Sequence, residues 1–157
     1  HNTVSSTRIR EALNSGDVQL ANKLLGYSYF FDGIVVRGDQ RGRTIGFPTA
    51  NLQVISEDKL IPVNGVYAVR VQIATGDGKF PDKTLNGMMN IGVRPTVDGT
   101  RKTIEVHLFN FSEDIYGKTL RVYLENFIRP EQKFGGLDEL KAQLARDQEE
   151  TLRLLKH

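Results

Sequence analysis

The chain of 157 residues contains no cysteine, and its three histidines stand at positions 1, 107 and 157. Without cysteine it has neither disulfide bonds nor thiolate metal ligands. A metal site made of several histidines is excluded as well, because only one histidine lies away from the chain ends. A cysteine-free chain suits a reducing compartment, so we expect a cytoplasmic protein.

An excess of one charge is also missing. The 21 basic and 19 acidic residues leave a formal net charge of +2, and no basic run stands out. Nucleic-acid binders concentrate lysine and arginine on one face, and single-strand binders add stacked aromatic rings. Aromatic residues make up only 8% here, which argues against an oligonucleotide-binding barrel. The sequence shows no secretory h-region and no apolar run of membrane-spanning length. We expect neither a nucleic-acid nor a membrane partner.

Hydrophobic residues make up 39% of the chain and charged residues 25%, a mixture that supports one domain with a real core. Residues 5–26 are predicted to form two short helices. The first ends at Asn14-Ser15-Gly16, Asp17 caps the second, and Gly26 ends it.

From Tyr29 to about Phe127 the pattern predicts strands. β-Branched and aromatic or alternating segments include "YFFDGIVV", "GVYAVRVQIA", "TLNGMMNIGV", "KTIEVHLFNF" and "KTLRVYLENFI". We count about six strands at hairpin-like spacing, which predicts an antiparallel, Greek-key-like β-barrel. After Pro130 a leucine stripe predicts an amphipathic helix that lies on the barrel. The expected fold is mainly β, with this C-terminal helix and the short N-terminal helices.

The stretch "GRTIGFPTAN", residues 42–51, follows a glycine-rich segment carrying Arg37, Arg41 and Arg43. Glycines let backbone N–H groups approach an anion closely. The spacing is neither a Walker A loop nor a dinucleotide fingerprint. A hairpin loop with surface arginines is the alternative.

Thr49 and Asn51 follow Pro48 and point to the same side of an extended segment. Both present neutral oxygens, which suit magnesium when substrate phosphates supply further ligands. Together with the glycine-rich loop they predict a nucleotide–metal site. The alternative is a turn in which both side chains bond the local backbone.

Strand alternation places Glu105 and His107 on one face and Ile104, Val106 and Leu108 on the other. A carboxylate within reach of a hydroxyl can act as a general base in phosphoryl transfer, and His107 would tune or orient it. The alternative is an ordinary solvent-exposed glutamate.

Three residues near the end of the predicted barrel suit a planar ligand. Tyr116 can cover a ring or a sugar, and Arg129 with Phe134 suits a heterocycle. Alternatively, Phe134 plugs the barrel end and Arg129 caps a carbonyl.

The motifs "GxVxxG…GRTIGFPTAN", "NIGVRPT", "IEVHLFNFSEDIYG" and "RPEQKF" occur in the order found in riboflavin kinases. From about Phe30 to the C-terminus the chain resembles the kinase module of bacterial bifunctional FAD synthetases. The resemblance implies transfer of the ATP γ-phosphoryl group to the riboflavin 5′-hydroxyl, giving FMN and ADP, with Mg²⁺. A non-catalytic flavin- or nucleotide-binding module is the rival interpretation.

The resemblance also implies roles for individual residues. Glu105 matches the catalytic base, and Thr49 and Asn51 match the magnesium-associated pair. The positions that match flavin contacts are Arg129 and Phe134. Those that match ATP contacts are Gly38, Arg43, Thr49, Leu108, Asn110 and Tyr116.

The N-terminal "VSSTRIR" resembles the closing motif of the adenylyltransferase module in the same bifunctional proteins. We therefore interpret residues 1–27 as a remnant of that module with linker helices, and residues 28–157 as the kinase domain. Ser5, Ser6, Thr7 and Arg10 are expected to be inert. We expect this chain to lack FAD synthesis, since the adenylyltransferase module is the absent partner.

Overall fold

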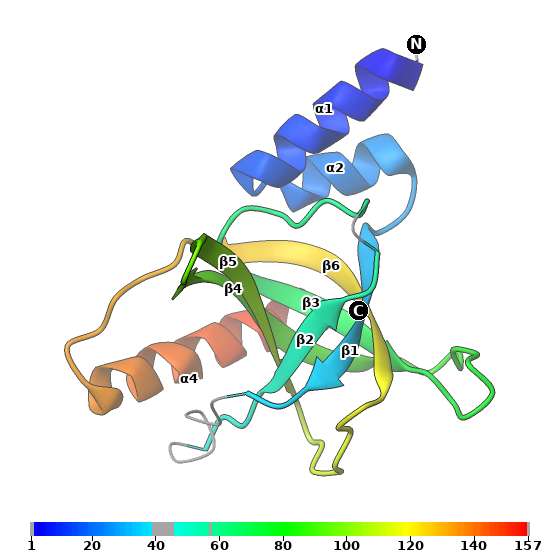
Figure 1. Ribbon diagram of the computed structural model, residues 1–157. Helices are drawn as coiled ribbons and strands as arrows, with labels where there is room; N and C mark the ends of the chain where they lie inside the picture. The colour runs from blue at the N-terminus through cyan, green and yellow to red at the C-terminus, as the bar shows by residue number, and fades with distance from the viewer. Residues whose placement is uncertain (1, 39–45, 57, 157) are drawn as a thin grey trace.

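The structure, a computed structural model, describes residues 2–38, 46–56 and 58–156. Six strands form a closed antiparallel barrel in the order β1-β2-β5-β4-β3-β6, with helices at one end and along one wall (Figure 1). The elements are α1 (Asn2–Ser15), α2 (Val18–Leu25), β1 (Phe30–Val36), β2 (Ala50–Val54), β3 (Gly65–Ile73), β4 (Leu85–Thr96), β5 (Gly99–Leu108), β6 (Thr119–Arg129) and α4 (Leu137–Leu154). The predicted mainly β fold is confirmed.

Helices α1 and α2 lie against one end of the barrel (Figure 1). The Asp17 side chain accepts a hydrogen bond from the Leu20 backbone N–H at 3.1 Å, and Gly26 ends α2 with φ 84°, so the predicted cap and end signal are confirmed. Leu13 and Val18 are buried in the same hydrophobic core as the barrel interior. The Asn22 side chain donates to the Leu124 carbonyl at 2.9 Å. The helix pair is therefore packed into the core of the barrel domain.

The barrel interior follows the alternation of the strands. On β5, Ile104, Val106 and Leu108 are buried, whereas Glu105 and His107 are half-buried on the outer face. Successive strand residues point to opposite faces, so this pattern fixes which β5 side chains fill the barrel and which remain available for chemistry.

Helix α4 covers part of the outer wall and packs on β3, β4 and β6. A second apolar cluster lies under it, formed by Val66, Met88 and Phe109 with Leu144 of α4 packed against them. At the C-terminal end of the helix, Arg70 donates to the Leu155 carbonyl at 3.2 Å. The predicted leucine stripe is confirmed in part: Leu144 packs on the barrel and Leu155 is buried, whereas Leu137 and Leu152 are exposed. None of the helices in the described part of the chain is long and apolar enough to cross a membrane.

The strand that the pattern did not single out is β2, the five residues directly after Thr49. It pairs with β1 on one side and β5 on the other, and closes the barrel. Ala50, Leu52 and Val54 join the interior core, which leaves Asn51 and Gln53 on the outer face.

Candidate active site

A polar row crosses the outer face of the barrel. Asn51 of β2 and Glu105 of β5 are direct Cα partners, and Glu105 is in turn the partner of Asn90 of β4. The row continues through Val66 of β3 to Arg129 of β6. Side chains of directly opposed residues share one face of a sheet. Strand register therefore gathers two amides, a carboxylate and a guanidinium along one line of the wall.

Thr49, in the segment directly before β2, contacts this row. Its Oγ1 donates a hydrogen bond to Glu105 Oε1 at 3.1 Å. The structure therefore brings together the three oxygen-bearing side chains that the sequence analysis singled out, at positions 49, 51 and 105.

His107 holds the backbone that carries Thr49. Its Nδ1 lies 2.7 Å from the Pro48 carbonyl oxygen, so this nitrogen carries the proton that is donated. The ring sits between Phe47 and Phe109, with centroid distances of 5.4 and 5.6 Å. Strand alternation predicted that His107 would tune or orient Glu105, but the hydrogen bond that the structure gives His107 is to the Pro48 carbonyl.

Gly38 is required by a close approach of Asn51. A Cβ atom at position 38 would lie 1.9 Å from Asn51 Nδ2 and 2.1 Å from its Cγ. Any larger residue at this position would push the Asn51 side chain away. Glycine is therefore needed here because it leaves room for Asn51, and not because the backbone makes a turn.

A cavity of about 620 Å³, here called the Tyr116 cavity, opens on one side of Thr49. Of the predicted nucleotide contacts, Gly38, Thr49, Leu108 and Tyr116 line it. The Arg37 guanidinium stacks over the Tyr116 ring at 4.5 Å from its centroid. Two of the predicted contacts are not placed there. Asn110, exposed and in the left-handed region with φ 54°, is not among the described lining residues, and Arg43 lies outside the described residues.

A second cavity of about 430 Å³, the Phe134 cavity, also has Thr49 in its lining. Glu105, Arg129 and Phe134 line it, and Leu140 and Leu144 of α4 add an apolar wall. Thr49 lines both cavities, whereas Asn51 lines only the first and Glu105 only the second. The Thr49–Glu105 hydrogen bond therefore lies on the boundary between the two.

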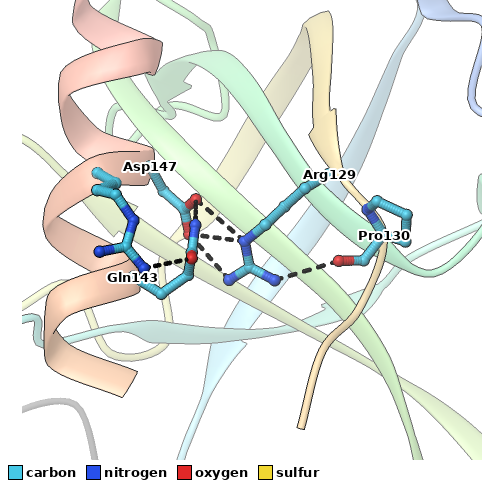
Figure 2. A network of polar contacts seen from close by, with 5 residues as sticks. Arg129, Pro130, Gln143 and Asp147 are labelled. Atoms are coloured by element: carbon cyan, nitrogen blue, oxygen red, sulfur yellow. Dashed lines mark hydrogen bonds and ion pairs between the residues drawn. The ribbon is translucent and has the colours of Figure 1, made fainter. Parts of the chain in front are cut away.

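Arg129 is held in place by helix α4. Its guanidinium pairs with the Asp147 carboxylate through three contacts of 2.8 to 3.0 Å and also donates to the Pro130 carbonyl at 3.1 Å (Figure 2). It lies 5.7 Å from the centre of the Phe134 ring. The alternative that Arg129 caps a carbonyl corresponds to its contact with Pro130, but the guanidinium also pairs with Asp147.

The donor set beside Thr49 suits magnesium that is bound together with phosphates. It consists of a hydroxyl, an amide and one carboxylate. Within the described ranges no three residues of the His, Cys, Asp and Glu types cluster as a metal site. Magnesium keeps several waters and commonly takes one or two protein oxygens plus substrate phosphates, so this sparse set fits it.

Asn90 is a site residue that the sequence motifs did not single out. This residue lies within the quoted "NIGVRPT" motif, but nothing in its neighbours marks it as functional. Its place beside Glu105 in the β4–β5 ladder and in the wall of the Phe134 cavity emerges only from strand register.

The sequence model of a family described as "Riboflavin kinase" matches residues 25–155. The bifunctional riboflavin kinase/FMN adenylyltransferase of Escherichia coli K12 is 50% identical over 145 residues, which cover 92% of this chain and 44% of that protein. The protein of the same name from Bacillus subtilis is 44% identical over 153 residues, or 96% and 46% of the two chains. The chain thus spans less than half the length of these curated relatives.

Solved structures share the fold. A crystal structure described as a macrolide-efflux protein from Streptococcus pneumoniae has a TM-score of 0.84 and 42% identity, covering 93% of this chain and 45% of its own. A riboflavin kinase from Trypanosoma brucei has a TM-score of 0.57 and 24% identity, covering 81% and 79%. The efflux description belongs to that one structure, whereas the family model and the curated relatives agree with each other. The chain belongs to the riboflavin kinase family.

Proposed function

We propose that this chain transfers the γ-phosphoryl group of ATP to the 5′-hydroxyl of riboflavin and releases FMN and ADP. The observation that carries the proposal is the hydrogen bond from Thr49 to Glu105, which joins a residue shared by both cavities to the only carboxylate of the polar row. Two ligands that occupy the two cavities would meet at this contact.

The Tyr116 cavity is the proposed ATP site. Gly38 and Arg43 act on the phosphates, and Leu108 and Tyr116 contact the rest of the nucleotide. Asn110 would contact the nucleotide from outside the described lining of the cavity. The volume of about 620 Å³ lies within the range typical of small-molecule sites. Thr49 lies where the phosphate end of the nucleotide would reach the Phe134 cavity.

Thr49 and Asn51 would hold Mg²⁺ together with phosphate oxygens. When bound there, the ion offsets the negative charge that gathers on the transferring group. Asn51 reaches this position because Gly38 leaves room beside it, and Thr49 because His107 holds the preceding carbonyl.

The Phe134 cavity is the proposed riboflavin site, with Arg129 and Phe134 against the flavin. Glu105 accepts the proton of the 5′-hydroxyl as its oxygen attacks the γ-phosphorus. The bond from the γ-phosphorus to the β–γ bridging oxygen breaks, and ADP leaves with that oxygen. Positioning and electrostatics provide most of the rate, and no covalent enzyme intermediate is needed.

We propose that the chain makes FMN but no FAD. The second activity in the names of its longer relatives, FMN adenylylation, would belong to their additional module. We take residues 28–157 as the kinase domain and residues 1–27 as a remnant of that module with linker helices. The partners are then small molecules, and the proposed site of action is the cytoplasm.

The experiment that tests the proposal is incubation with riboflavin, ATP and MgCl₂, followed by chromatography of the flavins and nucleotides. We expect FMN and ADP in equal amounts, no FAD, and no FMN when the metal is omitted. Binding of riboflavin and ATP without FMN formation would instead support the rival, a non-catalytic binding module.

A further inference from the structure

Asp147 is a charged residue buried in the middle of α4, with a side chain only 2% exposed. Carboxylates are almost never buried to this extent unless they are paired. Both of its oxygens accept from Arg129 Nε at 3.0 Å, and Oδ2 also accepts from Arg129 Nη2 at 2.8 Å. Gln143, one turn earlier on α4, donates to Oδ1 at 2.9 Å (Figure 2). Every partner that the described residues give this carboxylate lies on α4 or at the end of β6.

The pair fixes the orientation of the Arg129 guanidinium. Of its five N–H donors, Nε and one hydrogen of Nη2 point at Asp147, and one hydrogen of Nη1 points at the Pro130 carbonyl. As far as the described residues go, one N–H on each terminal nitrogen remains for a ligand. Arg129 lines the Phe134 cavity, so Asp147 decides how the guanidinium is presented there.

Helix α4 has other contacts with the barrel besides this ion pair. Leu144 packs on the apolar cluster under the helix, and Arg70 donates to the Leu155 carbonyl at its end. A buried ion pair contributes little net stability compared with apolar residues of the same size, because both charges lose their hydration. What it adds is a defined geometry.

We infer that Asp147 is a positioning residue of the acceptor site, which orients Arg129 toward the flavin. The inference rests on the proposed function, since it takes the Phe134 cavity as the riboflavin site. Through Asp147, helix α4 becomes part of that site, to which it also contributes Leu140 and Leu144. Asp147 itself does not touch the substrate and acts through Arg129.

The test compares Asp147→Asn with Asp138→Asn, which removes an exposed carboxylate from the same helix. Riboflavin alone is titrated and its Kd is read from flavin fluorescence, and kcat and KM are measured for both substrates. We expect Asp147→Asn to raise the Kd and KM for riboflavin about 10- to 100-fold, with kcat and the KM for ATP changed less than about threefold. Asp138→Asn is expected to behave as wild type. A folded Asp147→Asn protein with the wild-type riboflavin Kd would overturn the inference.

A double-mutant cycle separates positioning from independent effects. In an Arg129→Met background, Asp147→Asn is expected to change the riboflavin Kd less than about twofold, since the group that it orients is gone. An equal increase in both backgrounds would show that Asp147 acts independently of Arg129, and would overturn the inference.

A milder variant covers the case in which Asp147→Asn does not fold. Gln143→Met removes one hydrogen bond to the carboxylate and keeps the ion pair, so we expect a smaller rise in riboflavin Kd that disappears in the Arg129→Met background. An unchanged Kd would then overturn the inference.

Wild-type protein that binds riboflavin but forms no FMN would refute the kinase proposal alone and leave this binding test valid. Wild-type protein that does not bind riboflavin would overturn both.

Discussion

The Thr49 hydroxyl donates a hydrogen bond to the Glu105 carboxylate over 3.1 Å, although 56 positions of sequence separate the two residues. Two strand features produce this contact. The register of β2 on β5 makes Asn51 the Cα partner of Glu105, and Thr49 lies two residues before Asn51 on the same side. The proposed chemistry depends on this meeting point, because it is where the two cavities adjoin.

Removing the proposed base is the most direct test of Glu105. We expect Glu105→Gln to fold and to bind riboflavin and ATP, while kcat falls about 10²- to 10⁴-fold, the usual effect of losing a general base. FMN formation under saturating substrates measures it. Glu149→Gln, on the exposed side of α4, is the matched control and should keep wild-type kcat. A Glu105→Gln enzyme with near-full kcat would exclude this residue as the base.

Thr49 is expected to govern the magnesium dependence. Thr49→Ala removes one proposed oxygen ligand, so the Mg²⁺ concentration for half-maximal rate should rise several-fold, and kcat should fall. Thr49→Ser keeps the hydroxyl and should stay close to wild type. The measurement is a MgCl₂ titration at fixed ATP and riboflavin. Superimposable titrations for wild type and the alanine variant would count against Thr49 as a ligand.

Gly38→Ala should impair activity without unfolding the protein. The added Cβ would lie 1.9 Å from Asn51 Nδ2, the end of a side chain that is able to move away. We therefore expect Tm within a few degrees of wild type. The KM for ATP and the Mg²⁺ concentration for half-maximal rate should both rise. Gly76→Ala is the control, since a Cβ there has no neighbour within 4 Å. Unaltered kinetics in Gly38→Ala would mean that the position of Asn51 does not matter for the reaction.

The N-terminal helix pair is expected to be necessary for the stability of the barrel. Leu13 is 1% exposed and belongs to the main core, so Leu13→Ala should lower the free energy of unfolding by about 2–5 kcal/mol. Leu152→Ala, at a position that is 42% exposed, should change it by less than about 0.5 kcal/mol. Urea denaturation measures both. Equal, small effects would show that α1 and α2 are an appendage to the domain.

Two buried tyrosines predict a loss of stability in alkali. Burial raises the pKa of Tyr29 to about 12, from an ordinary value of 10.0, and burial also raises the pKa of Tyr67. A raised tyrosine pKa means that the folded state favours the neutral phenol. The resulting stabilisation is complete below pH 10 and is lost as pH rises through the folded-state pKa. We expect the free energy of unfolding to fall between about pH 10 and 12.

Tyr29→Phe separates this effect from general alkaline damage. The variant loses the hydrogen bond from the Tyr29 hydroxyl to the Leu60 carbonyl, so at pH 8 it should be about 1 kcal/mol less stable. Above pH 10 its stability should fall less steeply than that of wild type. Parallel curves for the two proteins would show that Tyr29 does not titrate differently on folding.

Local pattern was sufficient for much of the fold. Asp17 and Gly26 mark the bounds of α2 because capping and left-handed termination depend on neighbouring residues only. The alternation on β5 was equally readable, since each strand residue faces the side opposite to its neighbour. The short strand β2 was not singled out, because five residues after a proline carry little periodicity and their pairing is with distant strands.

Prediction of the site from sequence was less complete. Thr49, Asn51 and Glu105 stood out through their residue types and motifs, and the structure brings them together. Asn90 did not stand out, and His107 has a partner, the Pro48 carbonyl, that no local pattern indicates. These relations depend on the register between β2, β5 and β4, which involves residues far apart in the chain.

The sequence by itself determined the alternation that places Ile104, Val106 and Leu108 inside the barrel, the bounds of α2, and the family that the motifs resemble. All of these are read from residues that are close together in the chain. Only the tertiary structure decided that Thr49 lies between two cavities, and that a buried carboxylate of α4 holds Arg129. Both depend on how a closed barrel aligns its strands and on where the last helix docks. Packing of the whole chain sets those two features, and no segment contains them alone.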